Sequence, residues 1–294
     1  MDTLLLEHGG IEVELDPAYG GRVVSLIDTR AGREWMTSGG RSENTGEDAT
    51  YREDEAVGWD ECFPTVGAWD ATGTVWNRRL RDHGDLWGRP WKVEGATPQS
   101  ATLSYTASQF RFARTLRVEP ETLIARYTVQ NLSGEPLPYL WALHALLAVE
   151  PEDRIDLPGV HSVEVAYLAR AGERIEAARL PWTGPNGVLP HPLDQVQPPD
   201  SLLAGKFYAT GLPGGVARIG QPGRMLEIGW DGSIADLGIW MTYGAWPEPG
   251  GNYEVALEPT NAPADHVGQA IEAGALPLSP GQTRSWTVTF RFPR

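Results

Sequence analysis

Alternation of hydrophobic and polar positions is the dominant pattern of the chain, and it predicts β-strands. Ile11, Val13 and Leu15 alternate with glutamates, and the pair Gly9-Gly10 before them predicts a hairpin turn. The same period of two recurs at both ends and in the middle of the sequence. The strands predicted in this way are residues 4–7, 11–15, 22–28, 112–118, 123–131 and 286–292.

Helical periodicity is scarce. Residues 263–273 predict a short helix that begins near Asn261 or Pro263 and ends before Gly274. Strands separated by turn signals predict an all-β fold, namely a large antiparallel β-sandwich with few short helices. Strand patterning of the same kind continues on both sides of the loop segments, so we expect a single domain over residues 1–294.

Two segments lack strand patterning and predict long loops. Residues 37–56 are polar, acidic and contain glycine, and residues 180–201 contain six prolines. Loops of this length in a compact domain are usually functional or mobile.

Composition narrows the classes of partner. The 34 glycines and 24 prolines agree with many turns, and the formal net charge of −15 argues against nucleic acid and anionic membranes as partners. Cys62 is the single cysteine, so no internal disulfide can form. The first residues have neither a basic region nor a long apolar run. We therefore expect a cytoplasmic protein. We also expect it to be a monomer or a homodimer.

The first candidate for chemistry is His83, which is followed by Gly84 in a segment broken by Gly and Pro. Such irregular segments often line functional sites, and a neighbouring aspartate, Asp82 or Asp85, can orient an imidazole. The alternative is an ordinary surface turn.

His144 and Glu258 are the other two candidates. His144 shares its face of an apolar predicted strand with Leu140 and Ala142, so it is either a hydrogen-bonded core histidine or a histidine in a cleft. Glu258 is expected at a strand end, because Pro259 stops the pairing, and a carboxylate there can act as a general base. Glu254 lies on the same face and is expected to be more exposed.

Tryptophan is enriched, with 12 residues. Indole rings pack well on the C–H faces of pyranose sugars, although packing in the core is the alternative. Several tryptophans lie in turn-rich segments: Trp59, Trp69, Trp76, Trp87, Trp91, Trp182 and Trp246.

The order of these segments resembles the aldose 1-epimerase (galactose mutarotase) superfamily. The resemblance rests on His83-Gly84, on a hairpin at Asn131 that precedes His144, and on Glu258 before a proline. It extends over most of the chain through the segments at residues 20–26, 58–64 and 278–286. Phosphosugar relatives usually carry an arginine where this chain has Trp87, so the resemblance is to a divergent member.

The resemblance implies a carbohydrate-active isomerase that interconverts the anomers of a free sugar. Glu258 would act as the base on the O1 hydroxyl, His144 as the acid on the ring oxygen, and His83 as a hydrogen-bond partner. The expected partner is a small-molecule sugar, and no metal or organic cofactor is expected. The residues expected to bind the sugar are Asp60, Trp87, Arg89, Trp141 and Asp231.

Two other functions stay open at this point. A non-catalytic carbohydrate-binding protein could keep the same scaffold and its aromatic cleft. Another carbohydrate enzyme, a lyase or a hydrolase, is the second alternative, and a hydrolase would need a pair of carboxylates at a defined separation.

Overall fold

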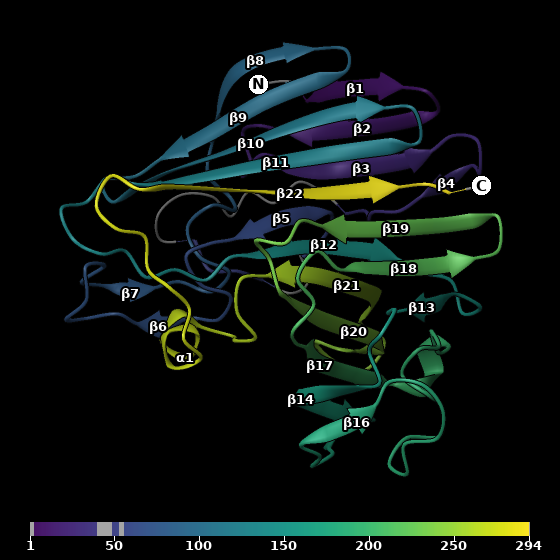
Figure 1. Cartoon of the computed structure of the whole chain (residues 1–294). Helices are drawn as coiled ribbons and strands as arrows, with labels where there is room; N and C mark the ends of the chain where they lie inside the picture. Colours follow the sequence, from purple (N-terminus) through teal and green to yellow (C-terminus); the bar gives the residue numbers. More distant parts are fainter. Residues whose placement is uncertain (1–2, 40–48, 53–55, 294) are drawn as a thin grey trace.

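The computed structural model describes residues 3–39, 49–52 and 56–293 and has an all-β architecture. Two large antiparallel sheets pack against each other to form a sandwich (Figure 1). Most of the predicted loop at residues 37–56, namely 40–48 and 53–55, lies outside the described residues. Among the described helices, none is long and apolar enough to cross a membrane.

The larger sheet has 12 strands, ordered β1-β2-β3-β5-β12-β21-β20-β17-β14-β15, with β4 beside β3 and β16 beside β14. Its central strands, β12, β21, β20 and β17, form the floor of the site described below. The strands are β1 (Leu4–His8), β2 (Ile11–Asp16), β3 (Arg22–Asp28), β4 (Arg33–Glu34), β5 (Trp59–Cys62), β12 (Ala142–Ala148), β14 (Ser162–Arg170), β15 (Glu173–Arg174), β16 (Arg179–Pro181), β17 (Leu203–Ala209), β20 (Asp236–Trp246) and β21 (Asn252–Thr260).

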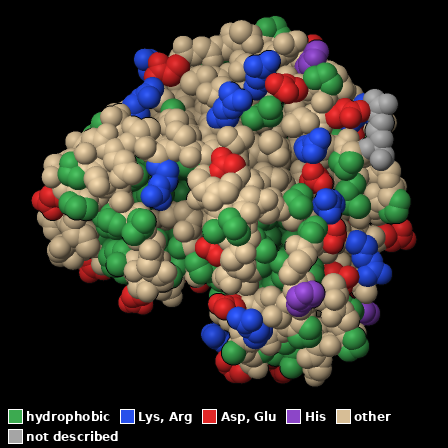
Figure 2. Space-filling view, in the orientation of Figure 1, with side chains coloured by type: hydrophobic (Ala, Val, Ile, Leu, Met, Phe, Trp, Pro, Cys, Tyr) green, Lys and Arg blue, Asp and Glu red, His purple; other side chains and the backbone are tan. Residues whose placement is uncertain are grey.

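The smaller sheet has 8 strands, ordered β13-β18-β19-β22-β11-β10-β9-β8. They are β8 (Lys92–Thr97), β9 (Ser100–Thr106), β10 (Phe110–Glu119), β11 (Thr122–Asn131), β13 (Arg154–Asp156), β18 (Val216–Gln221), β19 (Arg224–Trp230) and β22 (Thr283–Arg291). A short ribbon, β6 (Trp69–Asp70) and β7 (Arg79–Leu80), lies near helix α1 (Val267–Glu272), and a 3-10 turn, η2, spans Pro199–Ser201 (Figure 1). Acidic and basic side chains are interspersed on the face in Figure 2.

All six predicted strands are confirmed, as β1, β2, β3, β10, β11 and β22. The predicted helix is present as α1 but begins later, at Val267. The reason is local: the side chain of His266 accepts a hydrogen bond from the backbone N–H of Gln269, so His266, rather than Asn261 or Pro263, caps the helix.

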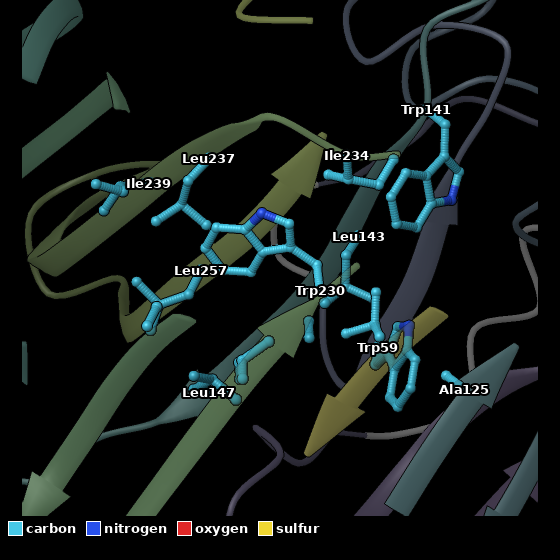
Figure 3. Packing of buried hydrophobic residues seen from close by; sticks show 14 of the residues in the cluster. Trp59, Ala125, Trp141, Leu143, Leu147, Trp230, Ile234, Leu237, Ile239 and Leu257 are labelled. Atoms are coloured by element: carbon cyan, nitrogen blue, oxygen red, sulfur yellow. The ribbon is translucent and has the colours of Figure 1, made fainter. Parts of the chain in front are cut away.

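The core lies between the two sheets, where the inward residues of each strand meet (Figure 3). The ring of Trp59 on β5 lies 4.6 Å from that of Phe290 on β22, and thus joins the sheets. For most of the tryptophans noted above, core packing is the correct interpretation. Five of them are buried: Trp59, Trp76, Trp87, Trp91 and Trp182.

A buried polar network also joins the sheets. The carboxylate of Glu61 on β5 accepts hydrogen bonds from Arg114 (2.9 Å), Tyr127 (3.0 Å) and the indoles of Trp59 and Trp141 (both 2.9 Å). Burial raises the pKa of Glu61, and Arg114 opposes that effect. Because these buried polar groups find partners, the network fixes how the sheets align.

Candidate functional site

The outer face of the larger sheet collects the chemically active side chains. On β21, Glu254, Ala256 and Glu258 point to this face, because side chains alternate along a strand. Residues that pair across neighbouring strands share a face. The partners of these three on β20 are Thr242, Trp240 and Gly238.

Strands β12 and β17 each add one functional side chain to this face. In the register that pairs Leu146 with Ala256, His144 on β12 lies opposite Glu258. Lys206 reaches the face from β17, on the far side of β20, and its ammonium group pairs with Oε2 of Glu258. Strand register, rather than sequence proximity, therefore brings the imidazole, carboxylate and ammonium groups together.

A pocket of about 220 Å³ opens over this face. Its walls combine aromatic rings with a few titratable groups, which is typical of small-molecule sites. The lining residues are Tyr51, Ala56, Val66, His83, His144, Leu146, Lys206, Trp240, Trp246, Asn252, Glu254, Glu258 and Asp265. All three predicted catalytic residues line this one pocket.

A loop after β7 delivers His83, and Gly84 makes this placement possible. His83 has a positive φ of 58°, and its N–H donates to the carbonyl of Val66 at 2.5 Å. Gly84 also has a positive φ, of 72°, and a Cβ there would overlap the carbonyl of Phe63. The His-Gly pair thus lets the loop press against the chain at Phe63 and hold the imidazole over the sheet.

The two imidazoles lie side by side, with ring centroids 4.7 Å apart. Tyr51 stacks on His83 with a centroid distance of 3.7 Å, which fixes the plane of that ring. Asp82 Oδ1 lies 3.3 Å from His83 Nδ1. Burial would raise the pKa of Asp82, but the hydrogen bond and charge of His83 outweigh burial and lower it.

His144 is buried, with 7% of its surface exposed. Burial lowers its pKa well below the ordinary value, and the nearby His83, Lys206 and Arg22 lower it further. The imidazole is therefore neutral at neutral pH. Its Nδ1 is buried and has no hydrogen-bond partner among the residues that the structure describes.

Glu258 does not end its strand, which corrects the sequence-based expectation. β21 continues through Pro259, which pairs with Leu237 on β20, to Thr260. On the other side, the pairing with β12 is interrupted between Thr260 and Ala256, so the missing N–H of Pro259 costs no ladder hydrogen bond there. The carboxylate is nevertheless 2% exposed and lines the pocket.

Gly238 leaves the space that the Glu258–Lys206 ion pair occupies. A Cβ at residue 238 would lie 2.9 Å from Glu258 Oε2 and 3.4 Å from Lys206 Nζ. We expect Gly238→Ala to displace the carboxylate and lower kcat of any turnover at least about 10-fold, since misplaced catalytic groups lose rate steeply. Steady-state kinetics with thermal unfolding measures both effects.

The matched control for that variant is Gly95→Ala on β8, where a Cβ would meet nothing within 4 Å. This control should keep both kcat and Tm. Unchanged kcat in Gly238→Ala would show that the position of the Glu258 carboxylate is not critical.

Glu254 is buried, and the expectation that it is more exposed was wrong. Its exposed fraction is 3%. It lines the pocket together with the indoles of Trp240 and Trp246. Burial raises its pKa to about 8, although hydrogen bonds from Asn252 and Trp240 act in the opposite direction. Besides Glu258 and Asp265, the pocket thus holds a third carboxyl group, which is largely protonated at neutral pH.

Three of the expected sugar-binding residues lie behind the pocket wall rather than in it. Asp60 on β5 is buried in an ion pair with Arg22, with an Nη2–Oδ2 distance of 2.6 Å. Trp87 donates its indole N–H to the Asp82 carbonyl at 3.0 Å. The guanidinium of Arg89 lies 5.7 Å from the ring centroid of Tyr105. These contacts support the loop and strand that carry His83 and His144.

The other two, Trp141 and Asp231, are not brought to the pocket. Trp141 lies in the core between the sheets (Figure 3), where its indole donates to Glu61. Asp231 follows β19 and caps a turn, accepting hydrogen bonds from the N–H groups of Ser233 (2.9 Å) and Thr287 (2.5 Å). Both side chains satisfy the protein's own groups, so a sugar in this pocket would not meet them.

Sequence reasoning missed Lys206, Tyr51 and Trp240 as lining residues. For Lys206 a signal was present, because a single lysine interrupts the apolar run of β17, LAGKFYA. A charge inside such a strand is rare unless it has a partner. Tyr51 and Trp240 carry no comparable signal.

One group of donor atoms, two of them from pocket-lining residues, could hold a metal ion. The thiol of Cys62 and the ring nitrogens of His83 and His144 lie within 4.8 Å of one another. Thiolate and imidazole are ligands that zinc accepts. However, burial raises the pKa of the Cys62 thiol well above its ordinary value, and Glu258 raises it further, so the thiolate form is disfavoured.

No protein-family model matches the chain, and no curated protein matches it. Several solved structures, however, match the chain in fold. A candidate aldose 1-epimerase from Escherichia coli K12 has a TM-score of 0.70 at 21% identity, with 99% of each chain covered. A galactose mutarotase related enzyme from Lactobacillus acidophilus has a TM-score of 0.66 at 15% identity and covers 100% of this chain and 98% of its own.

A galactose mutarotase-like protein from Lactobacillus casei gives a TM-score of 0.64 at 15% identity, covering 99% of this chain and all of its own, 100%. The chain therefore has the galactose mutarotase-like fold along its whole length. Its sequence has diverged far from these structures.

Proposed function

We propose that this protein is an aldose 1-epimerase-like isomerase that interconverts the anomers of a free sugar. The observation that carries the proposal is the convergence of His83, His144 and Glu258 on one sugar-sized pocket. A galactose mutarotase-like fold supports it as a carbohydrate-related scaffold. Fold alone does not establish activity, so the argument rests on the site.

The reaction needs a base and an acid on opposite sides of the anomeric centre. Oε2 of Glu258 pairs with Lys206, which leaves Oε1 to take the proton of the O1 hydroxyl. The C1–O5 bond then breaks, and the ring oxygen receives a proton from the imidazole pair. Rotation about C1–C2 and closure on the other face of the carbonyl reverse both transfers.

The two histidines divide the acid role. The family resemblance implies His144 as the acid, but its lowered pKa keeps it neutral in the free site. The ring centroids of His83 and His144 lie 4.7 Å apart, and Asp82 Oδ1 lies 3.3 Å from His83 Nδ1. We therefore assign proton donation to the imidazole pair, with His144 as the hydrogen-bonding group at the ring oxygen.

A hydrolase is less well supported by this geometry. The direct partner of the Glu258 carboxylate is the Lys206 ammonium group, not a second carboxyl group. Two other carboxyl groups, those of Glu254 and Asp265, line the same pocket, and Asp265 accepts a hydrogen bond from the Tyr208 hydroxyl at 2.6 Å.

The test is anomer interconversion across a panel of free aldoses, followed by polarimetry and by NMR exchange, with EDTA present to remove metal from the Cys62 group. Acceleration over the uncatalysed rate supports the isomerase. Binding of a sugar without acceleration would instead support the non-catalytic carbohydrate-binding protein.

A further inference from the structure

Cys62 lies beside the two imidazoles and is buried. On β5 it pairs with Ala142 of β12, two residues before His144, so Cys62 and His144 are diagonal neighbours on one face of the sheet. The loop after β7 places His83 next to His144. The sulfur atom and one nitrogen of each ring lie within 4.8 Å of one another. Three distant segments of the chain thus bring three possible metal ligands together.

The surroundings of the two imidazoles are those of metal ligands. Asp82 Oδ1 lies 3.3 Å from His83 Nδ1, which leaves Nε2 as the nitrogen that His83 can offer to a metal. A carboxylate behind the ring is a usual partner of a zinc-bound histidine. On the other ring, Nδ1 of His144 is buried and has no hydrogen-bond partner among the described residues. A bound ion is one of the few physical reasons for such a nitrogen.

The types of donor atom select the class of metal. One thiolate and two imidazoles are ligands that zinc accepts, whereas calcium and magnesium prefer oxygen. Around a tetrahedral zinc ion, such ligand atoms lie roughly 3.4 to 3.6 Å apart. Donor atoms that already lie within 4.8 Å of one another need to approach by only roughly 1 Å.

The protonated thiol of Cys62 has to lose its proton when a metal binds. Burial and the charge of Glu258 raise the pKa of this thiol in the protein alone. On metal binding the S–H bond breaks, a Zn–S bond forms, and the proton passes to the buffer. The negative charge of Glu258, which disfavours a thiolate, attracts a cation at the same place, against the opposing charge of Lys206.

We propose that Cys62, His83 and His144 form a binding site for a zinc ion, and that this ion and a sugar exclude each other. The exclusion follows because the two imidazoles that would donate a proton to the ring oxygen are then bound to the metal. Only the exclusion rests on the proposed function, and metal binding itself does not. Zinc is therefore an inhibitor of the isomerase, and a chelator restores the activity.

Metal binding is measured on the full chain after treatment with EDTA, by calorimetry with Zn²⁺ and by the absorption spectrum with Co²⁺. We expect one Zn²⁺ per chain and, with Co²⁺, a thiolate-to-cobalt charge-transfer band. Cys62→Ser should remove the band and weaken Zn²⁺ binding at least about 100-fold, because even the outer partners of a metal ligand contribute about 10- to 100-fold. His191→Ala removes an exposed histidine, and as the matched control it should bind like the wild type.

The Co²⁺ spectrum of the wild type reports thiolate ligation directly, so it decides the question even where Cys62→Ser does not fold. A wild-type spectrum without the band would overturn the site. A Zn²⁺ affinity that is unchanged in Cys62→Ser and falls in His191→Ala would also overturn it, because the ion would then be bound at the surface.

Polarimetry tests the exclusion, with the rate of each protein in EDTA as its own reference. We expect saturating Zn²⁺ to lower the rate of the wild type at least about 100-fold, the contribution of an acid–base group, and EDTA to restore it. Zn²⁺ binding at Cys62 in a protein that is inactive in EDTA would support the metal site and sink the isomerase. An isomerase whose rate is unchanged when zinc is bound would overturn the exclusion.

Discussion

Glu258→Gln should lower the enzymatic rate of anomer interconversion by about 10²- to 10⁴-fold, the usual contribution of one acid–base group. The amide has the shape of the carboxylate but cannot accept the O1 proton. Because glutamine has the same shape and residue 258 lines the pocket rather than the core between the sheets, the fold should persist. Polarimetry measures the rate, and circular dichroism with thermal unfolding monitors the fold.

The substitution leaves the Lys206 ammonium group without the partner that it has in the wild type. The double variant Glu258→Gln/Lys206→Met removes that charge too, and it should be as inactive as the single variant. Glu152→Gln, at an exposed position, is the matched control and should keep full activity. Activity near the wild-type value in Glu258→Gln would exclude Glu258 as the base.

The predicted strands share a physical reason for being predictable. β10 and β11 alternate between buried and more exposed residues, because one face packs on the core and the other meets water. β17 and β20 were not predicted, since the residues on both of their faces are buried or half-buried. Without a wet face the period of two disappears, and with it the sequence signal.

The same limit explains which site residues sequence reasoning found. His83 and Glu258 stand beside a glycine and a proline, which mark them locally. The lysine in the apolar run of β17 indicates that Lys206 has a partner, but the partner is set by the pairing of β17 with β20, a contact between distant segments. Trp141 was misplaced for a related reason, because an apolar sequence does not distinguish the inner face of a sandwich from the outer.

Glu254 leads to the second large prediction, a fall in stability as the pH rises. In the unfolded chain this carboxyl titrates at its ordinary pKa of 4.5, whereas in the folded protein burial raises the pKa to about 8. Below pH 4.5 both states are protonated, and the folded state bears no penalty. Between 4.5 and about 8 the unfolded chain loses the proton and the folded protein retains it, so each pH unit costs stability.

A pKa difference of this size corresponds to roughly 5 kcal/mol of stability lost between pH 4.5 and 8, at 1.36 kcal/mol per unit. Glu254→Gln removes the titration, and its amide can still accept from Asn252 and Trp240. We therefore expect the variant to match the wild type near pH 5 and to be more stable by several kcal/mol at pH 9.

Urea unfolding at pH 5, 7 and 9 measures this difference, with Glu152→Gln as an exposed control whose curve should run parallel to that of the wild type. If the stability of Glu254→Gln also changes with pH in parallel with that of the wild type, Glu254 is ionised in the folded protein. The pocket that Glu254 lines would then carry a further negative charge at neutral pH. The stability measurement thus tests, without any substrate, the charge state of the Glu254 carboxyl group in the folded protein.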